Sequence, residues 1–123
     1  MTTQPSTVGP GETLATARRM MRDHGIRHLP VLDGGTLVGV VSHRDLYASE
    51  SLVGPGANLV SQAMTHGAYP VAPHEPIGRV AGCMARRQFD CAVVVEQGRV
   101  VGIFTVTDAL SLIERSAGAD TAG

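Results

Sequence analysis

An internal repeat constrains this chain more than any other feature of its sequence. When the sequence is shifted by 63 residues, residues 1–48 align with residues 64–111 without a gap, and eleven positions are identical. Other positions exchange one apolar residue for another, such as Leu14 for Ile77 and Val41 for Phe104. A fixed period of this kind indicates two copies of one supersecondary unit. The sequence therefore predicts a protein that is built twice from the same plan.

Each copy predicts the same order of elements: a short strand, a helix, a hairpin of two apolar strands joined by a tight turn, and a second helix. In the first copy these elements are expected near residues 6–8, 13–24, 29–32, 37–41 and 44–51. In the second copy the first strand is expected near residues 69–71 and the first helix from residue 76. The hairpin strands are expected near 92–95 and 100–104, and the second helix near 107–115. We place Glu12 and Glu75 in the first turns of the longer helices and expect Gly25 to end the first of them.

The composition favours a sheet-based core. The chain has 43% hydrophobic but only 3% aromatic residues, so Val, Leu, Ile, Ala and Met must fill the interior. A unit of about 60 residues buries too little surface to be comfortable alone, so the two sheets should pack together about a pseudo-twofold axis. The predicted fold class is α/β (α+β), with two pseudo-symmetric β-α-β-β-α repeats packed through their sheets. The predicted boundaries are repeat 1 at 1–52, a linker and short helix at 53–63, repeat 2 at 64–116, and a flexible tail at 117–123.

Charge and hydropathy exclude several classes of protein. A formal net charge of −1 without any basic block gives no source of attraction to nucleic acid. No apolar run approaches the roughly 18 residues that span a bilayer, and no signal peptide is recognised, so a cytoplasmic protein is expected. Cys83 and Cys91 are interpreted as small core residues rather than a disulfide. His24 and His28 are four residues apart, but Gly25 ends the helix between them, so no metal site is expected.

A hydroxyl residue and an aspartate recur where each predicted hairpin gives way to a helix, as Ser42-x-x-Asp45 and Thr105-x-x-Asp108. This spacing is close to a capping box, in which the hydroxyl satisfies a helix N–H and the carboxylate faces the helix dipole. The same carboxylate can accept two hydrogen bonds from a ribose diol, and a helix N-terminus favours phosphate. Both roles are open on the sequence, and they do not exclude one another.

The segments Gly25–Asp33, Leu37–Asp45 and Val100–Asp108 together resemble the tandem cystathionine-β-synthase (CBS) domain pair, also called the Bateman module. The resemblance covers nearly the whole chain and occurs twice at one offset. It implies adenosine-type ligands in clefts between the copies and frequent homodimerisation into a flat disc.

The resemblance also implies that each cleft combines the copies, with the aspartate of one facing the first strand and hairpin start of the other. The implied ligand-binding residues of the first cleft are Ser42, Asp45, Tyr69, Val71 and Phe89. Those of the second cleft are Thr105, Asp108, Ser6, Val8 and Ile26. Apolar members would sandwich the purine, although Ile26 and Phe89 are equally compatible with an ordinary core position.

Basic residues distinguish the two clefts. We assign Arg27, His28, His43 and Arg44 to the Asp45 cleft, because the second copy has Asp90 and Cys91 before its hairpin. The Asp45 cleft is therefore expected to prefer phosphorylated adenosine, and the Asp108 cleft to be weaker, empty or suited to an uncharged adenosyl group. Arg27 and Arg44 are also compatible with solvated surface positions.

The predicted function is a stand-alone regulatory module that senses AMP, ADP, ATP or S-adenosylmethionine and responds through its dimer or partner surface. No nucleophile and base pair is recognised, so we predict no enzyme activity and no required cofactor. The alternative is a ligand-free CBS protein that serves dimerisation or interaction only, with side chains filling the clefts. An unidentified protein partner is compatible with both functions.

Overall fold

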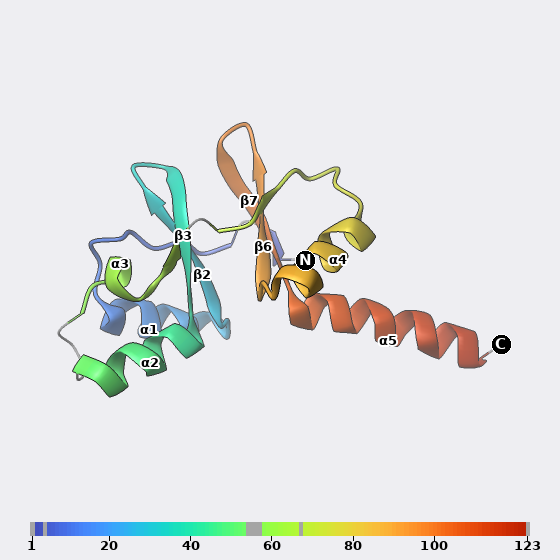
Figure 1. Ribbon diagram of the computed structural model, residues 1–123, viewed down its shortest axis with the longest axis horizontal. Helices are drawn as coiled ribbons and strands as arrows, with labels where there is room; N and C mark the ends of the chain where they lie inside the picture. The colour runs from blue at the N-terminus through green and yellow to red at the C-terminus, as the bar shows by residue number, and fades with distance from the viewer. Residues whose placement is uncertain (1, 4, 54–57, 67, 123) are drawn as a thin grey trace.

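The structure is a computed structural model that describes residues 2–3, 5–53, 58–66 and 68–122. The first copy contains β1 (Thr2–Thr3), α1 (Leu14–His24), β2 (His28–Asp33), β3 (Thr36–Ser42) and α2 (His43–Val53) (Figure 1). The short helix α3 (Val60–Ala63) follows. The second copy contains β4 (Thr65–His66), β5 (Pro70–Val71), α4 (Ile77–Arg87), β6 (Cys91–Glu96), β7 (Arg99–Thr105) and α5 (Val106–Ala122). Residues 54–57 of the predicted linker lie outside the described residues.

Tight turns with positive φ close both hairpins. Gly34 and Gly35 have φ of 58° and 87°, and Gln97 and Gly98 have 51° and 76° in the second copy. Positive φ at both central residues is the geometry of a type I′ turn, whose twist matches that of the flanking strands. The predicted hairpins are confirmed.

The start and end of α1 follow from local hydrogen bonds. Thr13 Oγ1 accepts the Thr16 N–H at 3.2 Å, and Gly25 ends the helix with a φ of 63°. Glu75 precedes α4, and Glu12 is likewise not in the first turn of α1, contrary to the prediction. Its Oε2 instead accepts the Gly9 N–H at 2.6 Å, because Thr13 already serves as the cap and Glu12 belongs to the preceding turn.

The two copies exchange their first strands. β1 of the first copy pairs with β7, and β4 of the second copy pairs with β3, both antiparallel. The result is a four-stranded sheet in the order β1-β7-β6-β5 and a three-stranded sheet in the order β2-β3-β4. In the first copy the strand predicted near residues 6–8 is reduced to one bridge between Val8 and Val31, whereas its counterpart forms β5.

Each copy has its own core, and a third cluster joins them. Leu29, Val31 and Val41 are fully buried beneath α1 in the first copy, and Ala92, Val94 and Phe104 lie beneath α4 in the second. The joining cluster is formed by Val40, Cys91, Val93 and Ile103, which come from β3, β6 and β7. This confirms that the repeats pack through their sheets. Cys91 belongs to this cluster, whereas Cys83 is only half-buried on α4.

The last helix is longer than predicted. It ends at Ala122 instead of near Arg115, which is compatible with its alanines and the lack of a proline after Arg115. The expected flexibility of residues 117–123 and the predicted domain boundaries stay predictions. Within the described parts of the chain, no helix combines the length and apolarity that crossing a membrane requires.

Candidate functional site

The two aspartates singled out in the sequence lie in equivalent capping boxes at the start of α2 and α5. Ser42 Oγ accepts the Asp45 N–H at 3.1 Å, while Asp45 Oδ2 accepts the Ser42 N–H at 2.8 Å. Thr105 and Asp108 repeat these bonds at 3.2 and 2.9 Å. The capping role is therefore present. Among the described residues no hydrogen bond to Oδ1 of either carboxylate is found, so this oxygen can accept from a ligand.

A hollow of about 290 Å³ contains Asp45, and its walls come from both copies. The first copy contributes residues at the start of β2, the end of β3 and the start of α2, namely His28, Val40, Ser42, Arg44 and Asp45. The second copy contributes the segment around β4 and the start of β6, namely Thr65, His66, Ala68, Tyr69, Gln88, Phe89, Asp90 and Cys91. The predicted meeting of Ser42 and Asp45 with Tyr69 and Phe89 is observed.

A second hollow, of about 630 Å³, contains Asp108. The second copy contributes Ile103, Thr105, Thr107 and Asp108. The first copy contributes residues 5–6 and the turn into β2, namely Pro5, Ser6, His24, Gly25, Ile26, Arg27 and His28. Ser6 and Ile26 thus lie with Thr105 and Asp108, as expected.

The hollows are related by the sequence repeat. Ten of the eleven residues that line the Asp108 cleft correspond, at the offset of 63, to residues that line the Asp45 cleft. The exception is His24, whose counterpart Arg87 does not line the Asp45 cleft. Strand exchange explains why the two linings correspond, because each aspartate faces a segment that enters from the other copy.

Side-chain size makes the clefts unequal. Tyr69 and Phe89 line the Asp45 cleft with ring centroids 5.2 Å apart and planes inclined by 33°. Ser6 and Ile26 occupy the corresponding positions in the larger Asp108 cleft. A hydrogen bond with Cys83, followed by burial, raises the pKa of the Tyr69 phenol. The Asp45 cleft therefore offers aromatic surface, and the Asp108 cleft offers more room.

The predicted charge asymmetry must be corrected. Arg27 lines the Asp108 cleft, and Asp90 lines the Asp45 cleft, the reverse of our assignment. The reason is that both residues precede a hairpin, and each hairpin start faces the aspartate of the other copy. His28 lines both clefts. Burial lowers its pKa, and this effect outweighs the negative charges of Asp90 and Asp45, which raise it. Arg44 lies in the Asp45 cleft as expected.

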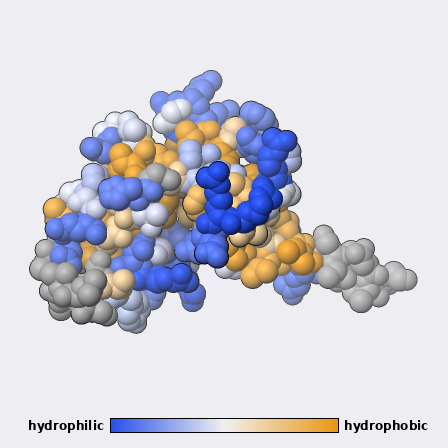
Figure 2. All heavy atoms as spheres, in the orientation of Figure 1, coloured by the Kyte–Doolittle hydropathy of each residue, from blue (hydrophilic) through white to orange (hydrophobic). Residues whose placement is uncertain are grey.

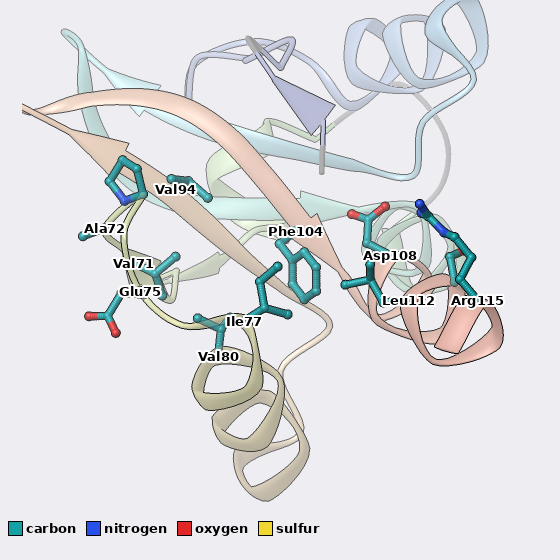
Figure 3. A pocket seen from close by; sticks show the side chains of 12 residues that line it. Val71, Ala72, Glu75, Ile77, Val80, Val94, Phe104, Asp108, Leu112 and Arg115 are labelled. Carbon is teal, nitrogen blue, oxygen red and sulfur yellow. The ribbon is translucent and has the colours of Figure 1, made fainter. Parts of the chain in front are cut away.

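Three other predicted residues lie outside both clefts. His43 is placed in a separate hollow beside α1, because the start of α2 turns it away from Asp45. Val8 is buried in the core of the first copy. Val71 lines an apolar groove between α4 and α5 with Ile77 and Phe104 (Figure 3).

A comparison with known domain families matches residues 1–50 and 60–115 to the CBS domain. The chain belongs to the CBS-domain family. Its two copies are the two CBS domains, and the strand exchange and the paired clefts are features of this CBS pair. Among the residues that the structure describes, no group of three His, Cys, Asp or Glu side chains could hold a metal ion.

Relatives and solved structures place the CBS pair in different contexts. The chain is 39% identical over 83% of its length to an inosine-5'-monophosphate dehydrogenase of Korarchaeum cryptofilum, but it spans only 21% of that protein. It is 30% identical over 88% of its length to the CBS domain-containing protein YhcV of Bacillus subtilis, of which it covers 78%. The CBS pair of protein MJ0100, solved with 5-methylthioadenosine and S-adenosyl-L-methionine, superposes with a TM-score of 0.83 at 25% identity, covering 94% of this chain and 93% of that one.

Several cleft residues were missed on the sequence. Asp90 was not assigned to the Asp45 cleft. Thr107, His24, His66 and Ala68 were not among the predicted ligand-binding residues, although they line the clefts. The repeat offset could have found Thr107, the counterpart of the predicted Arg44, but not His24, His66 or Ala68, whose counterparts were not predicted. Applying the offset of 63 to each predicted residue of one cleft gives its counterpart in the other.

Proposed function

We propose that this CBS pair is a regulatory module that binds an adenosine-type ligand in its clefts. The observation that carries the proposal is the matched pair of clefts, each lined by the aspartate of one copy and the hairpin start of the other. A carboxylate so placed suits the two hydroxyls of a ribose. The adenosyl ligands bound by the related MJ0100 pair support this choice of ligand class.

The lining charges favour different ligands in the two clefts. The Asp108 cleft combines Arg27 with the larger volume, and it is suited to a phosphorylated adenosine such as AMP, ADP or ATP. The Asp45 cleft contains two carboxylates, Asp45 and Asp90, against Arg44. It repels phosphate more strongly and suits an uncharged or sulfonium-bearing adenosyl group, such as that of S-adenosylmethionine.

The response is proposed to pass through a homodimer or partner surface rather than through catalysis. Leu110 and Ile113 on α5 are 59% and 63% exposed, and Ile77 on α4 is 54% exposed. Figure 2 shows hydrophobic side chains gathered on the surface of this part of the molecule. An apolar surface of this kind is typical of protein contacts. A cytoplasmic location is part of the proposal.

Calorimetric titration of AMP, ATP and S-adenosylmethionine into three variants tests the proposal. Asp108→Asn keeps an oxygen that can accept the Thr105 N–H but replaces an acceptor for the ribose with a donor. We expect the affinity for AMP to fall about 10- to 100-fold, since a charge-assisted hydrogen bond contributes about 1.5–3 kcal/mol. Asp45→Asn should instead lower the affinity for S-adenosylmethionine. The exposed Asp33→Asn is the matched control and should change neither affinity.

The exposed apolar residues of α5 favour a second candidate function, a CBS protein used for dimerisation alone. No heat with any of the three ligands, together with a stable dimer by analytical ultracentrifugation, would support this alternative. Binding that survives unchanged in both aspartate variants would contradict the ribose contact.

A further inference from the structure

A further hollow adjoins the Asp108 cleft on the helical side of the first copy. It has a volume of about 640 Å³ and is formed between α1, the turn into β2 and the start of α2. α1 and α2 pack against each other (Figure 1). We define the basic basin by its polar lining residues Arg18, Arg22, Arg27, His43 and Tyr47.

The charged residues described in the lining of the basin are all basic. Three arginines line it, and no acidic residue is among the described lining residues. Arg18 and Arg22 are one helical turn apart, which puts their side chains on the same face of α1. The acidic neighbour Asp23 is 3.9 Å from Arg22, and both side chains are well exposed, at 60% and 72%, so this ion pair neutralises little.

Aromatic side chains form the opposite wall. His43 and Tyr47 lie one turn apart on α2 with ring centroids 5.1 Å apart in an edge-on arrangement. The backbone N–H of His43 donates to the Arg27 carbonyl at 2.8 Å, which fixes the start of α2 against the turn that carries Arg27. This backbone hydrogen bond fixes the position of the aromatic wall, and the arginines of α1 lie across from it.

The basin is not a consequence of the fold, because the second copy lacks it. At the offset of 63, Arg18, Arg22 and Arg27 correspond to Ala81, Ala85 and Asp90. Charge compensation at the end of α1 applies to Arg22 in the last turn, whereas Arg18 and Arg27 lie outside that turn. Three arginines therefore converge in one copy only.

The basin adjoins the Asp108 cleft. Gly25, Ile26 and Arg27 line both hollows, so Arg27 belongs to both. An anionic group that binds Arg27 in the Asp108 cleft can extend toward Arg22, and it stays close to positively charged side chains along the way. Condensed phosphate is the anion that fits, because it presents several oxygens in a row to the guanidinium groups. Each guanidinium group can form a bidentate pair with a phosphate.

We propose that the basic basin binds a chain of condensed phosphates. The chain is either the triphosphate of a nucleotide whose adenosine occupies the Asp108 cleft, which rests on the proposed function above, or an inorganic polyphosphate.

Calorimetric titration with inorganic tripolyphosphate tests the basin without any adenosine. Binding is expected to weaken about two- to fivefold in Arg22→Ala, and further in Arg18→Ala/Arg22→Ala, since each exposed charged contact contributes about 0.4–1 kcal/mol. Arg19→Ala removes the same charge from an exposed position of α1 that does not line the basin, and it should bind as the wild type. Equal binding by wild type and Arg22→Ala would overturn the proposal. Circular dichroism confirms that each variant is folded.

ATP and AMP then identify the source of the phosphate. If the nucleotide spans both hollows, ATP binds more tightly than AMP, Arg22→Ala removes that advantage, and Asp108→Asn weakens both ligands. If the adenosine proposal is wrong, neither nucleotide responds to Asp108→Asn, while tripolyphosphate still responds to Arg22→Ala. The two proposals can therefore fail separately.

Discussion

Gly39 tests whether the exchange of strands holds the two copies together. It lies on β3 opposite His66 of β4, the strand that enters from the second copy. A Cβ at this position would lie 2.6 Å from the Thr65 carbonyl oxygen and 3.0 Å from Met64 Sδ. Ordinary contact distances are about 3.5 Å or more, so β4 would have to move by about 1 Å. The oxygen belongs to the backbone, and it cannot rotate away as a side chain would.

Gly39→Ala is therefore expected to lower the free energy of unfolding by about 1–3 kcal/mol, the range for overpacking in a folded interior. For a chain of this length the midpoint of thermal unfolding should fall by about 3–5 °C for each kcal/mol. Thr65 and His66 also line the Asp45 cleft, so ligand binding there should weaken more than binding in the Asp108 cleft.

Urea unfolding followed by circular dichroism measures the change. The control is Gly11→Ala, since a Cβ at Gly11 meets nothing within 4 Å. Its free energy of unfolding should stay within about 0.5 kcal/mol of the wild type or rise slightly. If Gly39→Ala were as stable as Gly11→Ala, the close approach of β3 and β4 would not be required for folding.

Three further predictions concern stability, each measured by urea unfolding. Thr13→Ala removes the oxygen that accepts the Thr16 N–H, and it should cost about 1 kcal/mol; an unchanged value would mean that the cap is dispensable. Burial, aided by the charge of Asp90, raises the pKa of the Cys91 thiol from 9.0 to about 12, so the unfolded chain releases this proton first. Stability should fall as the pH rises from 9 toward 12, and an equally steep fall in Cys91→Ala would refute this cause. Burial lowers the pKa of His28 below 6.5, so the unfolded chain takes up its proton first. Stability should fall as the pH drops below 6.5, and less so in His28→Gln.

The elements of each copy could be predicted because their signals are local. The hairpin turns, the cap at Thr13 and the stop at Gly25 depend on neighbouring residues and on backbone conformations that few residue types adopt. The repeat then required two similar units. The capping boxes of Asp45 and Asp108 were predictable for the same reason, since each is completed within three residues.

The exchange of β1 and β4 could not be predicted from local signals. Each strand has two residues, and their polar composition carries no alternation of apolar and polar positions. Gly39 and Gly102 are identical in the repeat, but the sequence gives no reason for the identity. In the structure each of these glycines lies opposite the strand that enters from the other copy.

The sequence by itself determined that the molecule has two like halves and that an aspartate begins the last helix of each. Local sequence signals did not decide which charges face which aspartate; the family resemblance implied the crossing of the copies, and the tertiary structure established it. Arg27 and Asp90 lie at matching positions in the repeat, yet crossing of the copies brings Arg27 to Asp108 and Asp90 to Asp45. Electrostatic partners are set by distance in space, and pairings between distant segments are fixed only when the sheets pack together.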